Sequence, residues 1–248
     1  MLTPSRLGCL VQHAGAMDSS PAKQLTEALY RPGPQFTTAE LQILVQDSAI
    51  RPVIGDVYAP ARLPDSPGLR ARCCRELLSS ALRQDAVICG ETAAWIHLGG
   101  PFTPTRIAVI TQGVFRRRTS AKISWQVHQL PLDSQDILRL HEVSVTSPRR
   151  TAADVFLGIG VAGSRRPLDL PPVQSSAAVH SAAPQIHEEI TAYRWGLIAR
   201  LSSAHPEALQ AETLTAQILS QLRESSGAQA RSARISALLQ ARVFARGS

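Results

Sequence analysis

Apolar positions recur along this chain with two different periods, which predicts a protein of mixed helices and strands. Short alternating or β-rich runs predict strands at 49–54, 57–59, 86–89, 106–111, 123–128, 136–140 and 143–146. Spacings of three and four predict helices at 23–31, from 38 onwards, and at 69–83, 91–98, 147–157, 185–202, 206–224 and 229–246. The predicted fold class is α+β, with a short N-terminal winged-helix-like segment, a central mixed α/β domain and a C-terminal helical tail.

Changes in composition divide the chain into five segments. Residues 1–20 show no periodicity and predict a flexible tail, while residues 161–184 are rich in Pro, Ser and Ala and predict a linker. Residues 21–60 predict a degenerate winged helix-turn-helix, residues 61–160 the central domain, and residues 185–248 the helical C-terminal region.

The N-terminal segment has the order helix, helix, hairpin. Thr37 followed three residues later by Glu40 is the spacing of a capping box, so a helix is expected to begin at Thr38. The pair Gly55-Asp56 between two β-rich runs predicts a two-residue hairpin turn. This order is typical of a truncated winged helix-turn-helix, and it is equally compatible with ordinary packing of short elements.

The stretch from Val143 to Asp154 carries the strongest local signals. A short strand is followed by Ser147-Pro148, a serine cap with proline at the first helical position. Arg149 and Arg150 then open a helix beside the end of a strand, where they could hold a phosphate or a carboxylate, or simply be solvated. Asp154 lies one helical turn after Arg150 and is placed to pair with it.

Three blocks in the middle of the chain, residues 53–59, 88–97 and 143–154, resemble in order the AbiEi family, the antitoxin half of type IV toxin–antitoxin systems. They read Val-Ile-Gly-Asp-Val-Tyr-Ala, Ile-Cys-Gly-Glu-Thr-Ala-Ala-Trp-Ile-His and Val-Ser-Val-Thr-Ser-Pro-Arg-Arg-Thr-Ala-Ala-Asp. In the last block Arg150, Thr151 and Asp154 stand at the recurring positions of the family motif. The resemblance spans roughly residues 36 to 157.

The resemblance implies a DNA-binding antitoxin without catalytic residues or cofactor. Members of such systems repress their own operon through an N-terminal winged helix and counter a nucleotidyltransferase-like toxin with the remainder of the chain. The expected partners are therefore operator or promoter DNA and a cognate toxin, and the expected location is the cytoplasm. No apolar run of 18 or more residues and no secretory signal pattern occurs, so no membrane association is expected.

The distribution of charge places the cationic surface in the middle of the chain. Lys and Arg number 26 against 19 Asp and Glu, and residues 61–166 hold 15 of the basic and 8 of the acidic groups. Residues 1–60 are net negative, and the stretch from Thr38 to Asp47 contains no basic residue. The residues expected to contact DNA are Thr38, Gln42, Arg51, Arg116, Arg117, Arg118, Lys122 and Arg149.

Two other functions remain open. The acidic N-terminal segment favours a protein-interaction module of the same fold that has lost DNA binding. An enzyme acting on nucleotides is a more distant option, because the sequence shows no phosphate-binding glycine loop and no carboxylate pair for a metal. His97, His128, Trp95 and Trp125 are interpreted as core residues, and the cysteines as reduced, buried thiols without a zinc site.

Overall fold

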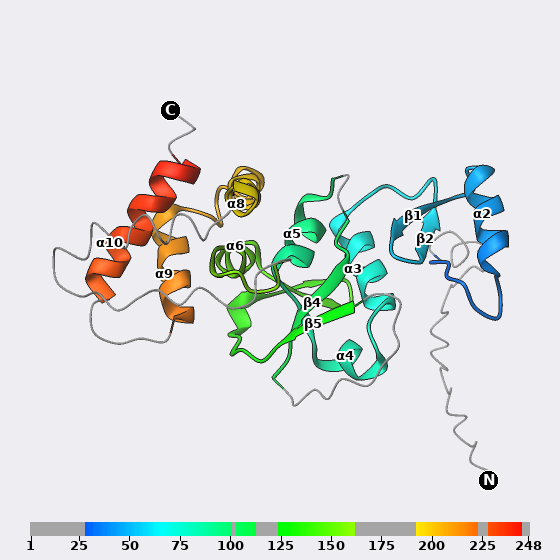
Figure 1. Cartoon of the computed structure of the whole chain (residues 1–248), viewed down its shortest axis with the longest axis horizontal. Helices are drawn as coiled ribbons and strands as arrows, with labels where there is room; N and C mark the ends of the chain where they lie inside the picture. Colours follow the sequence, from blue (N-terminus) through cyan, green and yellow to red (C-terminus); the bar gives the residue numbers. More distant parts are fainter. Residues whose placement is uncertain (1–27, 101–102, 113–123, 162–191, 223–227, 245–248) are drawn as a thin grey trace, which may run out of the picture.

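The computed structural model describes residues 28–100, 103–112, 124–161, 192–222 and 228–244. Helix α2 and the β1–β2 hairpin lie at one end, a five-stranded sheet lies in the middle, and helices α8 to α10 lie at the other end (Figure 1). The chain is thus a mixed α/β protein with a helical C-terminal region, as predicted. The predicted tail at 1–20 and the predicted linker at 161–184, apart from its first residue, fall outside the described residues.

At the N-terminal end, α2 (Thr38–Gln46) begins as predicted. The Thr37 side chain accepts from the Glu40 N–H, and the Glu40 carboxylate accepts from the Thr37 N–H at 2.7 Å. Strands β1 (Ile50–Ile54) and β2 (Val57–Pro60) pair antiparallel around Gly55-Asp56, which confirms the predicted hairpin.

The helix predicted at 23–31 is wrong for its described part, residues 28–31. Tyr30 forms a backbone bridge to Tyr58 instead, with N–H to O distances of 2.9 Å in both directions. The Tyr30 ring packs edge-on against Phe36 with the centroids 5.6 Å apart. The hairpin therefore offers this segment a strand partner, and that tertiary contact overrides the local helical spacing. The described residues contain one helix and the hairpin of the expected winged helix.

The central sheet has the strand order β5-β4-β3-β7-β6. Its members are β3 (Val87–Ile88), β4 (Arg106–Ile110), β5 (Ser124–His128), β6 (Ile137–Leu140) and β7 (Val143–Thr146). The pairs β3–β7 and β4–β5 are parallel, and β3–β4 and β6–β7 are antiparallel. All five predicted strands of the central region are therefore present, with ends shifted by one residue or so.

Alternate residues of the sheet pack into two hydrophobic cores, one on each face. Ile107 and Val109 of β4 join the core that holds α3 (Pro67–Glu76), α4 (Ser80–Asp85) and residues of the hairpin. Ala108 and Ile110 point to the opposite core, which holds α6 (Pro148–Leu157) and the C-terminal helices. Helix α5 (Gly90–Leu98) contributes to both. The sheet is thus the middle layer, with α3 and α6 on its two faces (Figure 1).

One long helix was expected at 69–83, and the structure breaks it in two. Helix α3 ends at Glu76, and the Ser79 side chain caps α4 by accepting from the Leu82 N–H. Arg83 donates back across the break to the carbonyls of Leu78 and Glu76, at 3.0 and 2.8 Å. The break satisfies its own backbone groups, so apolar periodicity alone does not reveal it.

The C-terminal helices are α8 (Ala192–Ala204), α9 (Ala211–Gln221) and α10 (Ala228–Leu239), the last followed by a π-helical turn (Gln240–Phe244). Arg194 of α8 is buried and donates to the carbonyls of Val155 and Phe156 at the end of α6. In the same manner buried Arg70 donates to the Ile96 carbonyl near the end of α5 at 3.0 Å. Two of the arginines therefore serve as helix C-terminal caps.

Gly90 gives a direct test of the packing between the two layers. Its φ is +56°, and a Cβ there would lie 2.4 Å from the Ile159 carbonyl oxygen. Gly90→Ala is expected to lower the free energy of unfolding by about 2–4 kcal/mol, since both backbone strain and overpacking oppose the methyl group. Gly196→Ala is the control, because that helical position is open and alanine there is expected to add about 0.5–1 kcal/mol. Urea unfolding measures both, and equal stability of the two variants would contradict the structure.

Candidate functional site

Arg150 lies at the centre of a buried ion network. Its Nη1 donates to Asp136 Oδ2 at 2.6 Å and to the Pro131 carbonyl at 3.2 Å, and its Nε donates to Asp154 Oδ1 at 2.9 Å. Arg150 is 3% exposed and Asp154 is 0% exposed. The interpretation of Arg150 as a solvated arginine is therefore wrong, and the carboxylates that it holds belong to the chain itself.

The local sequence places this network at the start of α6. The Ser147 hydroxyl accepts from the Arg150 N–H, with Pro148 in the first turn, so the helix begins immediately after β7. The fully buried Thr151 hydroxyl donates to the Thr146 carbonyl of β7 at 3.0 Å. Thr151 thus fastens α6 to the sheet and Arg150 fastens it to the turn that holds Asp136, while Asp154 pairs with Arg150 within the helix.

Helix α9 reaches the same network from the C-terminal region. Gln217 Nε2 donates to Asp136 Oδ1 at 3.0 Å, so each oxygen of this carboxylate has a partner. A cavity of about 90 Å³ lined by Arg150, Asp136 and Gln221 lies beside the contact. The network consequently joins elements that are more than 80 residues apart in the sequence.

The network contains two carboxylates for one guanidinium. Asp154 Oδ2 is buried and has no hydrogen-bond partner within the described part of the chain. Burial raises the pKa of Asp154 to about 7, although Arg150 opposes the shift. Burial also works against the charge of Arg150, but Asp154 and Asp136 outweigh it and raise the pKa of Arg150. These groups are shielded from solvent, so their role is to hold the fold.

The structure does not bring the predicted DNA contacts together. Thr38 and Gln42 are exposed on α2, and Arg51 of β1 donates to the Leu63 carbonyl at 3.2 Å. Arg149 is half-buried at the start of α6, which packs beside α8 and α9, far from α2 (Figure 1). Arg116, Arg117, Arg118 and Lys122 lie outside the described residues.

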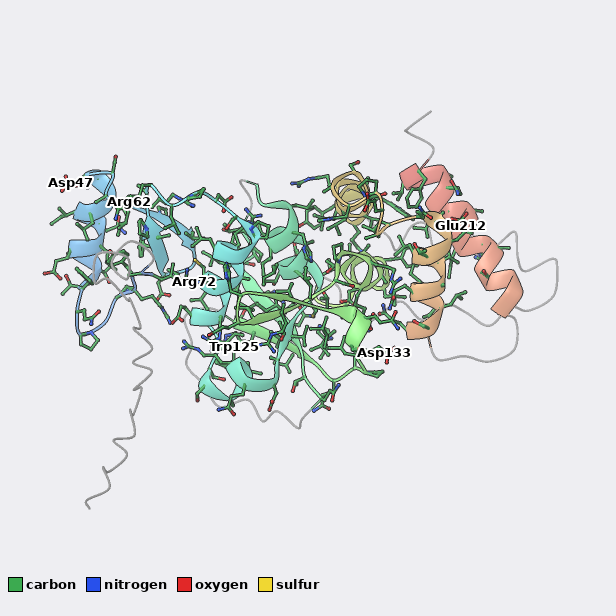
Figure 2. The ribbon with its side chains drawn as sticks, turned by 180° about the vertical axis from the view of Figure 1, so that it is seen from behind. Asp47, Arg62, Arg72, Trp125, Asp133 and Glu212 are labelled. Carbon is green, nitrogen blue, oxygen red and sulfur yellow. The ribbon has the colours of Figure 1, made fainter. Side chains whose placement is uncertain are left out.

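A different set of arginines lines a groove between α3–α4 and the turn that joins β6 to β7. Its wider part has a volume of about 750 Å³ and its narrower part about 340 Å³. Both parts share Arg75, Glu142 and Val143, so they form one recess, which we call the arginine groove. Its charged and imidazole side chains are Arg72, Arg75, Glu76, Arg83, Arg139, His141 and Glu142. Figure 2 shows Arg72 on α3, between Asp47 at one end of the molecule and Glu212 of α9 toward the other.

Four arginines face two glutamates in the arginine groove, which leaves an excess of positive charge. Arg83 is already engaged, since it pairs with Glu76 Oε2 at 3.3 Å and caps the break after α3. The Nε of Arg75 is buried and has no partner among the described residues. Arg139 is exposed on β6 and forms no ion pair within that same set. Arg75 and Arg139 are thus the cations of the groove best placed to bind an anion.

His141 stands at the β6–β7 turn with its backbone in the left-handed region, at φ +53°. Its imidazole lies so close to Gly68 of α3 that a Cβ there would fall 2.5 Å from Nε2. The glycine therefore admits the ring, which forms part of the wall of the wider compartment. His97, in contrast, is structural: it is buried, its Nε2–H donates to the Thr146 carbonyl at 2.8 Å, and burial lowers its pKa to about 4.

Sequence analysis missed the arginine groove because its walls are distant in the chain. Arg72 and Arg75 look like the polar side of an amphipathic helix, while Arg139 lies 64 residues after Arg75 on an edge strand. The one available signal is the spacing of three between Arg72 and Arg75, which places both on one face of α3.

No family model, curated protein or solved structure matches this chain. The resemblance to the AbiEi family therefore depends on the three sequence blocks alone. Within the described ranges, no helix is long and apolar enough to cross a bilayer, and no three His, Cys, Asp or Glu side chains cluster to hold a metal. Cys73, Cys74 and Cys89 are free and buried, which confirms that prediction for the three described cysteines.

The raised pKa of Asp154 predicts an unusual pH dependence of stability. The folded chain keeps this proton up to about pH 7, whereas the unfolded carboxyl loses it near pH 4. The contribution of Asp154 to stability is therefore greatest at low pH and is lost as the pH rises between these values. Asp154→Asn removes this titration. As the pH rises from 5 to 7, the free energy of unfolding of the variant is expected to increase relative to that of the wild type by up to about 1.4 kcal/mol per pH unit. Above pH 7 the difference should level off.

The matched control is Asp85→Asn, which removes an exposed carboxyl at the end of α4. Its difference from wild type is expected to stay flat across the same range. Chemical denaturation at four pH values is sufficient, and a flat curve for Asp154→Asn as well would show that this carboxyl is ionised throughout.

Proposed function

We propose that this chain is a non-catalytic regulatory protein that binds nucleic acid, as expected of an AbiEi-like antitoxin, and that the arginine groove is its contact surface. The observation that carries the proposal is that Arg75 of α3 and Arg139 of β6 both line one recess with excess positive charge. Phosphate neutralisation by arginine supplies most of the affinity of a protein for a nucleic acid backbone. Such neutralisation requires guanidinium groups that are not already engaged, and these two meet that requirement.

The usual surface of a winged helix is a poor candidate here. Helix α2 has Glu40 in its first turn and Asp47 at its C-terminus, and it has no cation. The hairpin turn carries Asp56, which Arg31 holds at 3.1 Å. Helix α2 would therefore meet phosphates with carboxylates, and the charge at the hairpin turn is already paired. Backbone contact is better served by the arginine groove.

A binding role is also supported by what the motif residues do. Arg150, Thr151 and Asp154 are buried and hold α6 to its neighbours, so they are withdrawn from any substrate. In the groove, the Glu76 carboxylate is paired with Arg83, which leaves Glu142 as the acid without a described ion pair. One isolated carboxylate beside arginines favours anion binding over metal-assisted hydrolysis.

The family resemblance extends the proposal to a partner protein. An AbiEi-like antitoxin would repress its own operon and counter a nucleotidyltransferase-like toxin. A neighbouring gene for such a protein, together with rescue of growth when both are expressed, tests this part independently of nucleic-acid binding.

A second candidate function is a protein-interaction module that has lost DNA binding. The observation in its favour is Ile43, which is 55% exposed on α2 beside acidic residues. An exposed apolar side chain flanked by carboxylates is better suited to contact a cationic protein than DNA, because the carboxylates repel phosphates.

Removing both available groove cations is expected to weaken nucleic-acid binding. The probe is DNA from upstream of the gene, used both as a duplex and as separate strands. Arg75→Ala combined with Arg139→Ala should reduce the affinity for whichever form binds by at least 10-fold. The slope of log affinity against log salt should fall by about 1.4–1.8, because two phosphate contacts are lost. Fluorescence anisotropy at several salt concentrations measures both quantities.

Arg200→Ala provides the control, because it removes the same charge from an exposed position on α8. Its affinity and salt slope are expected to match the wild type. If both variants lose binding equally, the effect is one of net charge and the groove is not the contact surface.

The role of α2 can be tested separately. Thr38→Ala combined with Gln42→Ala removes the two exposed polar side chains expected at base edges, while Leu41 keeps the helix packed. We expect affinity within 2-fold of wild type, because α2 offers no phosphate contact. A loss of 10-fold or more in the same binding assay would return DNA recognition to the winged helix.

A further inference from the structure

We infer that the arginine groove takes an unpaired nucleic acid strand in preference to a duplex. This inference depends on the proposed function and names the form of nucleic acid that the same site accepts. It follows from where the cations lie, from the floor beneath them and from the ring at the β6–β7 turn.

The first observation concerns shape. Proteins that recognise duplex DNA insert a protruding helix or ribbon into its groove and place cations on that protrusion. Here α2, at the end of the molecule, carries Glu40 and Asp47, and the hairpin turn carries Asp56, which Arg31 links to the Glu76 carbonyl of α3. Arg75 and Arg139 instead line a recess. A single strand can enter a recess, whereas a rigid double helix contacts only its rim.

The second observation concerns the floor. The narrower compartment is lined by apolar side chains beneath its arginines, namely Leu78, Leu82, Ala86, Ile88 and Val143. All five are buried in the hydrophobic core, so the floor is fixed. Because these side chains are almost inaccessible, the lining that a ligand meets is mostly polar, which suits the sugar-phosphate backbone of a strand that bends into the recess.

The third observation is His141. The imidazole is exposed and forms part of the wall of the wider compartment, and its position is set by close approach to Gly68. Sequence-tolerant binding of single strands uses aromatic faces on which bases stack. The left-handed backbone at His141 directs this ring from a tight turn, a conformation that costs free energy for a residue other than glycine. Stacking of a base on the His141 ring would account for a histidine at this left-handed position.

The inference is tested with the full chain and three labelled probes of one mixed 12-nucleotide sequence: a DNA strand, the same strand as RNA, and the DNA duplex. Anisotropy titrations are expected to give at least 10-fold tighter binding for a strand than for the duplex. The DNA and RNA arms identify which unpaired strand is preferred.

Two variants test the residues. His141→Asn keeps a residue that tolerates the left-handed backbone but removes the ring, and it should weaken strand binding about 10-fold. His141→Tyr restores an aromatic face and should recover most of the affinity. Arg139→Ala should weaken every probe that binds, whereas Arg200→Ala should weaken none. Thermal unfolding of each variant confirms that it is folded.

The outcomes separate the two proposals. Arginine-dependent binding of the duplex as tight as that of the strands would overturn the preference for an unpaired strand and leave the proposed function standing. Equal affinity of wild type and His141→Asn for the strands would remove base stacking from the site and overturn the inference in that respect. Absence of arginine-dependent binding to all three probes would overturn both proposals.

Discussion

The buried contact of Arg150 with Asp136 and Asp154 is the interaction on which the arrangement of the chain depends. It joins α6 to the turn before β6, and through Gln217 it joins that turn to α9. A guanidinium removed from water is costly unless its donors are engaged, and here Nε and Nη1 each have an oxygen partner. Loss of Arg150 would leave the buried carboxyl groups of Asp136 and Asp154 without their cation, which costs more than the pairs themselves contribute. The geometry of the network therefore fixes where the C-terminal helices can pack.

Two further arginines show the same use of a desolvated guanidinium. Arg70 binds a carbonyl near the end of α5 and pairs with Asp65 at 2.7 Å, and Arg194 binds the carbonyls at the end of α6. Helix C-termini leave several carbonyls without partners, and a planar group with five donors can satisfy more than one of them. The excess of arginine over lysine in this chain thus has a structural basis at three positions. Counting charge along the sequence cannot separate these arginines from those that face solvent.

Local signals predicted the elements well and their associations poorly. The Thr37–Glu40 box, the Gly55-Asp56 turn and the Ser147-Pro148 start each depend on neighbouring residues, and each is present in the structure. The break after Glu76 and the bridge of Tyr30 to Tyr58 depend on partners elsewhere, so periodicity alone predicted helix at both. Burial of Arg150 has the same origin, because Asp136 and Gln217 come from other parts of the chain. The pair with Asp154 was predictable from its spacing, but its burial was not.

The separation of the arginines into buried and groove-lining sets also bears on function. The conspicuous motif at 149–154 attracts a functional interpretation, yet Arg150 is committed to holding the fold. Arg75 and Arg139 have no sequence motif, and they become neighbours only because β6 pairs with β7 and α3 packs across both. Under the proposed function, a nucleic acid strand between them would meet a floor already fixed by the core, so little binding free energy would be spent on ordering that floor. The proposed binding surface thus depends on two guanidinium groups that the fold brings together without using them, more than on the net charge of the chain.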